Sequence, residues 1–386
     1  MTLRKAIFWI HLVCGVVSGV IVAIMSATGV AIAFEEELLA WRDREASRVE
    51  APADASARRL TPDELRAASL RARPDFAVTR VVVHREPGRA AELFAGREGP
   101  LYADPYTGAV RDSRAHGLHE VIHELEEWHR WLAMEGDWFP IGRAMTGAAN
   151  LAFVLLCLTG LWLWFPRGWS VRSLRSRLWF VRGRRGKARD RNWHEVFGFW
   201  SLPVLLVLGV TAVAISYEWG HRLVFTLAGE EAPKARNFGM MTQAPVVLPE
   251  PQVGATPVAL DEALQVVMTR FPDWRSIGLA YPRPTGPDAA SEPLRFDVIV
   301  PDHMPSRAWM PVESDPFTGE IVRATHFDER SPGLRARVWA RFLHTGAGFG
   351  LPGKVIATLA SLAALVLVYT GFALSWRRLR AAQKCP

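Results

Sequence analysis

Four long stretches of the chain contain no Asp, Glu, Lys or Arg, and they limit the possible folds more than any other feature. These stretches are Ala6–Phe34, Ala144–Phe165, Val196–Tyr217 and Val355–Trp376. Each of them, folded as a helix, is long enough to cross the roughly 30 Å hydrocarbon core of a bilayer. We therefore predict an integral membrane protein with four helical spans.

The first apolar stretch has to be distinguished from a secretory signal. Ala31-Ile32-Ala33 has the small-x-small form of a signal-peptide cleavage site. The stretch is, however, much longer than the apolar region of a signal peptide. We expect it to stay in the protein as the first span.

The basic residues predict how the spans are oriented. The predicted loop at 166–193, between the second and third spans, is rich in Lys and Arg and contains a single acid, Asp190. Further basic residues precede the first stretch or follow the last one: Arg4, Lys5, Arg377, Arg378, Arg380 and Lys384. Because short cytoplasmic segments are enriched in Lys and Arg, both termini and the central loop are expected in the cytoplasm. Topology thus accounts for the formal net charge of +7, with the lipid bilayer as the partner and no nucleic acid.

This topology divides the chain into spans, external segments and cytoplasmic parts. The predicted spans are residues 6–34, 144–165, 194–217 and 355–376. The external segments are 35–143, with an amphipathic helix at about 116–134, and 218–354; the cytoplasmic parts are a basic loop at 166–193 and a tail at 377–386. The three cysteines, Cys14, Cys157 and Cys385, lie in spans or in the tail. No disulfide framework therefore supports the external segments, and each is expected to fold on its own core.

The second half of the chain repeats motifs of the first half. His11 and Thr28 recur as His194 and Thr211 at a constant offset of 183 residues. The second and fourth spans share a Thr-Gly pair, at 159–160 and 370–371, and the external segments share Asp-Pro-aromatic-Thr-Gly, at 104–108 and 315–319. This self-similarity indicates an internal duplication in which each half is a span, an external domain and a second span.

Each external segment has the pattern of a small α+β domain. Residues 63–73 and 260–270 have helical apolar spacing and follow the Thr-Pro pairs at 61–62 and 256–257. Residues 78–84 and 294–300 are predicted strands, the Asp-Pro-aromatic-Thr-Gly sequences are predicted tight turns, and 280–292 is a predicted surface loop. The predicted fold is an α-helical, four-helix transmembrane bundle with two external α+β domains.

Four histidines occupy matched positions near the ends of the spans. His11 and His194 lie at the cytoplasmic ends of the first and third spans, whereas His129 and His344 precede the second and fourth spans on the external side. Each face of the bundle thereby offers two imidazoles from different helices, as a six-coordinate haem requires. The chain contains no C-x-x-C-H sequence, so such haems would be non-covalent and b-type. We predict two haems b, an inner one with His11 and His194 as axial iron ligands and an outer one with His129 and His344.

Small and basic residues near these histidines fit the same interpretation. Glycines beside the ligands leave room for a flat macrocycle: Gly15, Gly19, Gly198, Gly346 and Gly348. Candidate partners of the haem propionates are Arg4, Arg191, Arg130 and Arg341. A structural alternative stays open for each histidine, because an intramembrane imidazole also bonds to carbonyls or lies among headgroups. His84, His303 and His326 have no matched partner and are expected to be solvated loop residues.

His119-Glu120-Val121-Ile122-His123 is a competing signal, since H-E-x-x-H on a helix is typical of zinc hydrolases. The short distance to the second span leaves no room for a surrounding catalytic domain. We interpret the nearby acids, Glu120, Glu124, Glu126 and Glu127, as a solvated face or a landing surface for a cation or ferric chelate. His123 also remains an alternative to His129 as ligand, because both project from the same predicted helix.

The combination of these motifs resembles the bacterial PepSY-associated transmembrane family. The resemblance covers essentially the whole chain and rests on Trp128-His129-Arg130-Trp131-Leu132, on the sequence from Leu158 to Trp164 and on the two Asp-Pro-aromatic-Thr-Gly turns. This family includes iron-regulated inner-membrane proteins and a dihaem reductase that acts on the siderophore ferrioxamine. The third span departs from the family pattern at Thr211-Ala212, where the usual glycine is missing, and we expect this change to affect packing more than ligation.

The resemblance implies a multi-pass protein of the bacterial inner membrane with two periplasmic PepSY-type domains. It also implies an oxidoreductase that delivers electrons to a ferric siderophore, of hydroxamate type, and releases Fe(II). A cytoplasmic reductant or the quinone pool would be the electron donor. Two alternatives stay open: a dihaem protein linked to quinone that serves another acceptor, and a haem-free membrane protein whose PepSY-type domains bind or regulate another protein.

Overall fold

The computed structural model describes residues 2–54, 57–96, 99–166, 168–233, 246, 248–249, 255–281, 292–301, 304–305 and 308–383. His303, Lys384, Cys385 and most of the predicted loop at 280–292 lie outside these residues. The chain forms two compact units. One comprises Met1–Glu35, Val121–Met241 and Pro332–Pro386, and the other comprises Glu36–Glu120 and Thr242–Ser331.

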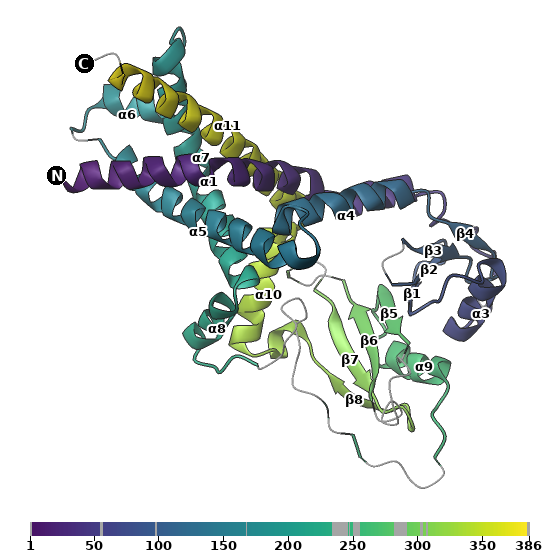
Figure 1. The fold of residues 1–386 in the computed structure, drawn as a ribbon. Coiled ribbons are helices and arrows are strands. Elements are labelled where there is room, and N and C mark those ends of the chain that lie inside the picture. Colours follow the sequence, from purple (N-terminus) through teal and green to yellow (C-terminus); the bar gives the residue numbers. More distant parts are fainter. Residues whose placement is uncertain are drawn as a thin grey trace. The chain divides into compact units, whose positions relative to one another are not determined.

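Four long helices dominate the first unit: α1 (Leu3–Ile32), α5 (Phe139–Trp164), α7 (Gly186–Ser216) and α11 (Gly350–Ala382). All four have the length and composition of a membrane span, which confirms this part of the prediction. They pack in the cyclic order α1, α5, α7 and α11, and α11 in turn contacts α1 (Figure 1). Helices suit hydrocarbon because their backbone N–H and C=O groups are paired within the segment.

Small residues allow these helices to pack closely. Cys157, Leu205, Ala360 and Ala364 form a buried cluster between α5, α7 and α11. The buried amide of Asn150 donates a hydrogen bond to the carbonyl oxygen of Gly209 (3.1 Å), which ties α5 to α7. Without a hydrophobic driving force in lipid, such contacts and interhelical hydrogen bonds hold the bundle together.

The helices extend beyond the charge-free stretches. Helix α7 begins at Gly186, within the segment predicted as a loop, and that segment also contains the short helix α6 (Val171–Leu178). Asp190 on α7 is fully buried and forms ion pairs with Arg189 and, across to α11, with Arg377. A stretch without Asp, Glu, Lys or Arg marks only the part of a helix that lies in hydrocarbon. Charged side chains that are paired, or that extend towards water, are tolerated at the helix ends.

Shorter helices flank the spans. They are α2 (Glu35–Arg42), α4 (His116–Trp131), α8 (Glu218–Leu227) and α10 (Pro332–His344), with single 3₁₀ turns η1 (Gly136–Trp138), η3 (Phe327–Glu329) and η4 (Ala347–Phe349). Helix α4 ends at Trp131 because Leu132 and Ala133 have positive φ values of 58° and 50°. Left-handed residues end a helix, and here they turn the chain towards α5.

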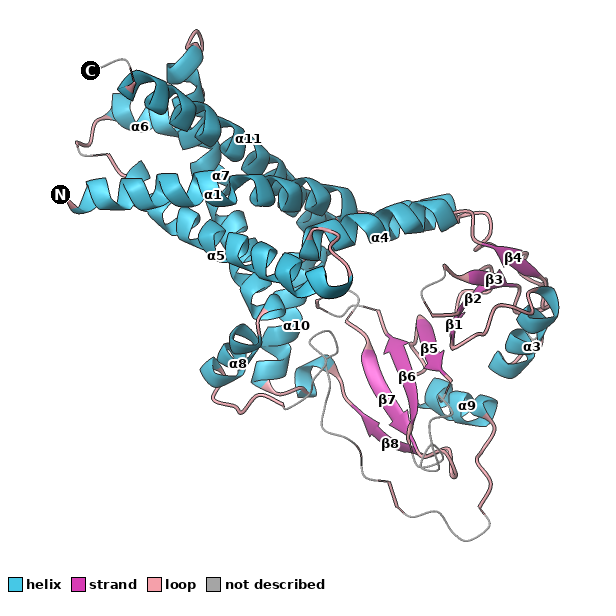
Figure 2. Ribbon diagram, in the orientation of Figure 1, coloured by secondary structure: helices cyan, strands magenta, loops and turns pink. Residues whose placement is uncertain are grey.

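The second unit contains one antiparallel sheet of eight strands in the order β4-β3-β2-β1-β5-β6-β7-β8 (Figure 2). The first external segment supplies β1 (Arg80–His84), β2 (Ala91–Phe94), β3 (Leu101–Ala103) and β4 (Val110–Asp112). The second supplies β5 (Ser276–Ala280), β6 (Leu294–Ile299), β7 (Met310–Ser314) and β8 (Ile321–Ala324). The expected pair of separate domains thus shares one sheet, joined where β1 pairs with β5. Pairing covers two strand edges that would otherwise present unpaired N–H and C=O groups.

One helix from each segment packs against its own strands. Leu65 of α3 (Pro62–Ala72) belongs to a core with Val81 and Leu93, whereas Leu264 of α9 (Leu260–Arg270) belongs to a core with Ile277. Each segment therefore keeps its own hydrophobic core, as expected, although the sheet is continuous.

The predicted helix starts and turns are partly correct. Thr61 caps α3 by accepting a hydrogen bond from the N–H of Glu64 (3.2 Å), but Ala259, and not Thr256, precedes α9. Asp104 accepts hydrogen bonds from the N–H groups of residues 106 and 107, and Asp315 repeats this turn with residues 317 and 318. Gly108 and Gly319 complete the two turns with φ values of +73° and +72°.

The pairing of β1 with β5, which we call the seam of the sheet, offers a test of the fold. Val81 on β1 is fully buried and lies opposite Leu279 on β5. Replacing Val81 with Ala leaves a cavity there, and we expect it to lower the free energy of unfolding of the sheet unit by about 2–3 kcal/mol. Val322→Ala on β8, where the valine is exposed, is the matched control and should change it by less than about 0.5 kcal/mol. Denaturant unfolding of the purified chain measures both; equal effects would contradict the β1–β5 seam.

Candidate cofactor sites in the helical bundle

The inner pair of predicted ligands meets inside the bundle. His11 on α1 and His194 on α7 have ring centres 6.3 Å apart, and their ring planes are nearly perpendicular, at 89°. Helices α1 and α7 both pack against α5 and α11. The two imidazoles therefore approach each other from different sides of the bundle.

The outer pair meets in the same way. His129 on α4 and His344 on α10 have ring centres 6.2 Å apart, with an angle of 57° between their planes. His123, the alternative to His129, instead forms an ion pair with Glu127 on its own helix, with 3.4 Å between Nε2 and Oε1. It is thus His129 that lies opposite His344.

These separations can be compared with those of two axial ligands on one metal. Two metal–nitrogen bonds of about 2 Å, with about 1.1 Å from each ring nitrogen to its ring centre, place the two ring centres about 6.2 Å apart. Both histidine pairs have this spacing. The donor set therefore fits a six-coordinate haem at each end of the bundle.

The opposite ring nitrogen, Nδ1, of each histidine contacts a threonine hydroxyl on a neighbouring helix. Nδ1 of His11 lies 2.9 Å from Oγ1 of Thr159, and Nδ1 of His194 lies 2.9 Å from Oγ1 of Thr370. The corresponding distance is 3.1 Å from His129 to Thr28 and 3.4 Å from His344 to Thr211. Because Nδ1 is occupied on all four rings, Nε2 is the nitrogen left for a metal.

Glycines make room for three of these rings. A Cβ atom on Gly160 would lie 3.3 Å from Cε1 of His11, and one on Gly29 would lie 3.3 Å from Cε1 of His129. At Gly371 the distance to Cε1 of His194 is 3.8 Å. Each glycine directly follows the threonine that contacts the same ring. The fourth threonine, Thr211, is followed by Ala212, and its contact with histidine is the longest of the four. Ala212 therefore lies beside a contact to one of the four histidines, and the expectation that it affects packing more than ligation stays a prediction.

The other two glycines singled out from the sequence, Gly346 and Gly348, have a different role. Gly346 has a φ of +73°, and a Cβ atom there would meet the backbone of Gly353 at 2.8 Å. A Cβ atom on Gly348 would instead lie 3.1 Å from Cζ3 of the Trp339 ring. Both glycines lie in the turn between α10 and α11, and the positive φ at Gly346 favours glycine there.

A cavity of about 730 Å³ surrounds the inner histidine pair. Most of its wall is apolar, and Gly15, Gly19 and Gly198 lie on it together with both histidines. At Gly19 the wall is close enough that an added Cβ atom would meet the ring of Phe372 at 2.8 Å. A largely apolar cavity lined by helix glycines suits a flat, apolar macrocycle.

One end of this cavity is basic. Its lining there includes Arg4, Arg177, Lys187, Arg191 and Arg378, with the single acid Glu195. Two of the proposed propionate partners, Arg4 and Arg191, belong to this group. Arg130 instead lies over the ring of Trp131, 4.7 Å from its centre, and Arg341 is exposed on α10. An apolar cavity with cations at one end matches an apolar ring that carries two carboxylates.

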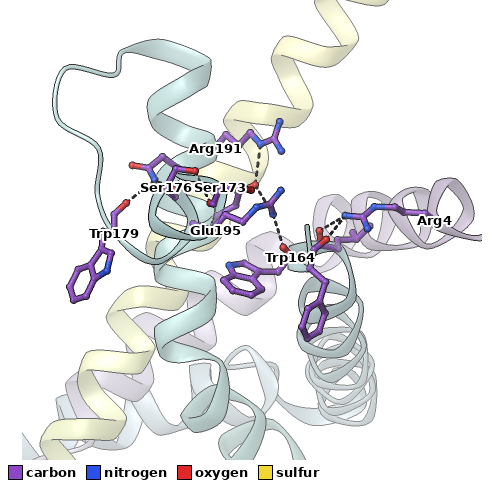
Figure 3. Close-up of polar contacts among 11 residues, drawn as sticks. Arg4, Trp164, Ser173, Ser176, Trp179, Arg191 and Glu195 are labelled. Carbon is purple, nitrogen blue, oxygen red and sulfur yellow. Dashed lines mark hydrogen bonds and ion pairs between the residues drawn. The ribbon is translucent and has the colours of Figure 1, made fainter. Parts of the chain in front are cut away.

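Hydrogen bonds fix this basic end (Figure 3). Arg4 donates to the carbonyl oxygens of Leu163 (2.8 Å) and Phe165 (2.9 Å) at the end of α5. Arg177 of α6 donates to the carbonyl oxygen of Trp164 (2.6 Å) and lies 3.4 Å from Glu195. Glu195 also accepts from Arg191 (3.1 Å). These contacts satisfy the terminal carbonyl groups of α5. Side chains from three helices, α1, α6 and α7, thereby hold the basic end of the cavity in place.

The outer imidazoles are in the protonation state that binds metals. Burial and the nearby ring of His344 lower the pKa of His129 to about 4, and burial also lowers the pKa of His344. A lowered pKa means that both rings are neutral at neutral pH. Neutral imidazole is the form that ligates iron.

The H-E-x-x-H sequence does not form a zinc site with the residues that the structure describes. Among them, no group of three or more His, Cys, Asp or Glu side chains lies close enough to hold a metal ion. Glu120 pairs with His116 one turn earlier, and Glu124 accepts a hydrogen bond from the indole of Trp128 (2.9 Å). The acids of α4 therefore act mainly within their own helix.

Sequence reasoning identified the four histidines but gave no role to the threonines. Thr28, Thr159, Thr211 and Thr370 are visible in the sequence as repeated positions. Their contacts with histidines become apparent only once the helices are packed. Thr28 and Thr211 lie at the opposite end of their span from the histidine of the same helix, and Thr159 and Thr370 lie on spans that carry none of the four histidines. The repeated Thr-Gly pair is the sequence feature that could have indicated a role for these threonines.

Most of the chain matches a known protein family. The family model described as PepSY-associated TM region matches residues 8–378. No curated protein matches the chain. The match runs from within α1 to within α11 and so includes α5, α7 and the sheet.

The glycines beside the rings generate a prediction. Gly160→Ala forces the imidazole of His11 to move, and overpacking of about 1–3 kcal/mol should weaken haem binding at the inner site about tenfold or more. Gly371→Ala, at an ordinary contact distance of 3.8 Å, should weaken it by no more than about threefold. Gly117→Ala on α4, with open space around it, should have no effect. Titration of the detergent-purified apoprotein with haemin, followed by absorbance, compares them, and an unaltered Gly160→Ala variant would refute the close approach.

Proposed function

The chain belongs to the PepSY-associated transmembrane family, and we propose that it is a dihaem b-type reductase of the bacterial inner membrane. In this proposal it passes electrons across the membrane to an Fe(III)-siderophore in the periplasm and so releases Fe(II). The observation that carries the proposal is the pair of facing imidazoles at each end of the bundle, with ring centres 6.3 Å and 6.2 Å apart. Two such pairs on one bundle favour two redox centres over one isolated site.

Each residue set has a defined task in this function. His11 and His194 hold the inner haem, and His129 and His344 hold the outer one. When bound, each haem supplies a centre that accepts and releases a single electron. Arg191 and Lys187 at the basic end of the inner cavity bind the propionate carboxylates. The largely apolar wall of the inner cavity would exclude water from the bound macrocycle.

The distribution of charge supports an orientation. The basic segment that contains α6, and both chain termini, are assigned to the cytoplasm because Lys and Arg are enriched there. The sheet unit is then periplasmic, and each of its four-strand halves is a PepSY-type domain of a duplicated chain. The inner histidine pair lies on the side of the electron donor, which we take to be a cytoplasmic reductant or quinol.

Reduction is a sufficient means of releasing iron from its carrier. A siderophore of the hydroxamate type binds Fe(III) through hard anionic oxygens and binds Fe(II) far less well. One electron transferred to the chelate gives Fe(II) and the free siderophore, so the electron balance is complete. The outer histidine pair is the exit point for this electron.

Electron transfer across a sealed membrane tests the proposal. Proteoliposomes are loaded with dithionite, given an external Fe(III)-hydroxamate, and assayed for Fe(II) with an impermeant chromogenic chelator. We expect His11→Ala and His129→Ala each to remove one haem and to lower the rate at least about a hundredfold, because one centre of the path is lost. His116→Ala, an exposed histidine paired with Glu120, should match the unaltered protein.

The outcomes of this assay separate the alternatives. Unchanged haem content and rate in both ligand variants would refute the assignment. A haem-containing protein that oxidises quinol but leaves the ferric chelate unreduced would favour a quinone-linked protein with another acceptor. A colourless protein would favour a haem-free binding or regulatory role.

A further inference from the structure

We propose that Thr28, Thr159, Thr211 and Thr370 are positioning residues that select the metal-binding nitrogen of each histidine and set the plane of its ring. This inference rests on the proposed function, since it concerns how the haem ligands are held. It adds to that function a set of four interhelical contacts, each between one threonine hydroxyl and one Nδ1 atom.

The hydroxyl proton of each threonine is already used. Oγ1 donates to the carbonyl oxygen four residues earlier in its own helix, at 2.7 Å for Thr28, Thr159 and Thr370 and at 2.6 Å for Thr211. The oxygen can therefore only accept from the imidazole. A neutral ring that donates from Nδ1 carries its proton there, which leaves the lone pair on Nε2. The threonines thus fix the tautomer that ligates through Nε2.

Backbone carbonyls reinforce this selection at the outer pair. Nδ1 of His129 lies 2.9 Å from the carbonyl oxygen of Met25, and Nδ1 of His344 lies 3.0 Å from that of Leu208. A carbonyl oxygen has no proton to give, so these nitrogens must be the donors. The two assignments, from hydroxyls and from carbonyls, agree.

The same contacts give the two histidine pairs different ring geometries. The planes are 89° apart at the inner pair and 57° apart at the outer pair. In a low-spin ferric haem the angle between the axial rings sets the splitting of the iron d orbitals, and a perpendicular arrangement gives the larger maximum g value. The two haems should therefore have distinct electron paramagnetic resonance signals, with the inner one at the larger g value.

How strongly the position of a histidine ring depends on its threonine should differ between the inner and the outer pair. Among the described residues, Nδ1 of His11 has a single hydrogen-bond partner, the hydroxyl of Thr159, at 2.9 Å. His344 has the carbonyl of Leu208 at 3.0 Å and the hydroxyl of Thr211 only at 3.4 Å. Loss of the hydroxyl should consequently release the ring of His11 and leave that of His344 largely in place.

Isosteric variants test this inference. Thr159→Val should weaken haem binding at the inner site about 10-fold to 100-fold, shift the inner resonance signal and raise the inner reduction potential, because the ligand loses basicity. Thr159→Ser keeps the hydroxyl and should restore all three properties. Thr211→Val should change the outer site by no more than about threefold. Thr358→Val on α11 is the matched control: its Oγ1 is buried and has no hydrogen-bond partner among the described residues.

The proposal is overturned if Thr159→Val has the resonance signal, potential and affinity of Thr358→Val. Should Thr159→Val not fold, the smaller Thr159→Ala, which also removes the hydroxyl, takes its place. Nitrogen-15 spectra of histidine in the apoprotein add a measurement that needs no haem: we expect Nδ1 of His11 to be protonated, and protonation at Nε2 would overturn the inference. A haem-free wild type that still shows the expected tautomer would refute the proposed function and leave the hydroxyl contacts intact, so the two failures are distinguishable.

Discussion

The bundle depends on one constraint, that polar groups in hydrocarbon must find partners within the protein. Within the long helices, backbone N–H and C=O groups form hydrogen bonds with each other. Several polar side chains in the bundle are paired across helices. Asn150 bonds to α7, and Asp190 is held between Arg189 and Arg377. An imidazole in this setting also needs a partner for each nitrogen. The threonine hydroxyls supply one, and the facing imidazoles leave a space of the right width for a metal between them.

The two halves of the chain are joined in different ways in the two units. In the helical unit, histidines from the first half face histidines from the second, so neither half alone can form a six-coordinate site. In the sheet unit, β1 pairs with β5 and makes one sheet from two sets of four strands. Each half nevertheless keeps its own hydrophobic core. The histidine pairs, more than the cores, require both halves.

Local patterns in the sequence predicted much of this arrangement, and non-local packing decided the rest. The absence of charged residues predicts the four spans, and the apolar spacing predicts the bounds of α9. The matched positions of the four histidines in the two halves identify them as candidate ligands. The shared sheet was not predictable, because strand patterns do not reveal which edge a strand pairs with. The contact between Thr159 and His11 joins residues 148 positions apart, and no local rule links them. Gly346 and Gly348 are predicted beside a ligand from sequence proximity, and the structure adds that they lie in the turn between α10 and α11.

We propose that each histidine pair holds one haem. The most direct test of this proposal is the haem content of the detergent-purified protein, with absorption spectra recorded before and after reduction with dithionite. We predict two low-spin b haems per chain, both reducible. A protein that contains no haem after expression with ample haem supply would contradict it and return these histidines to a structural role or to another metal.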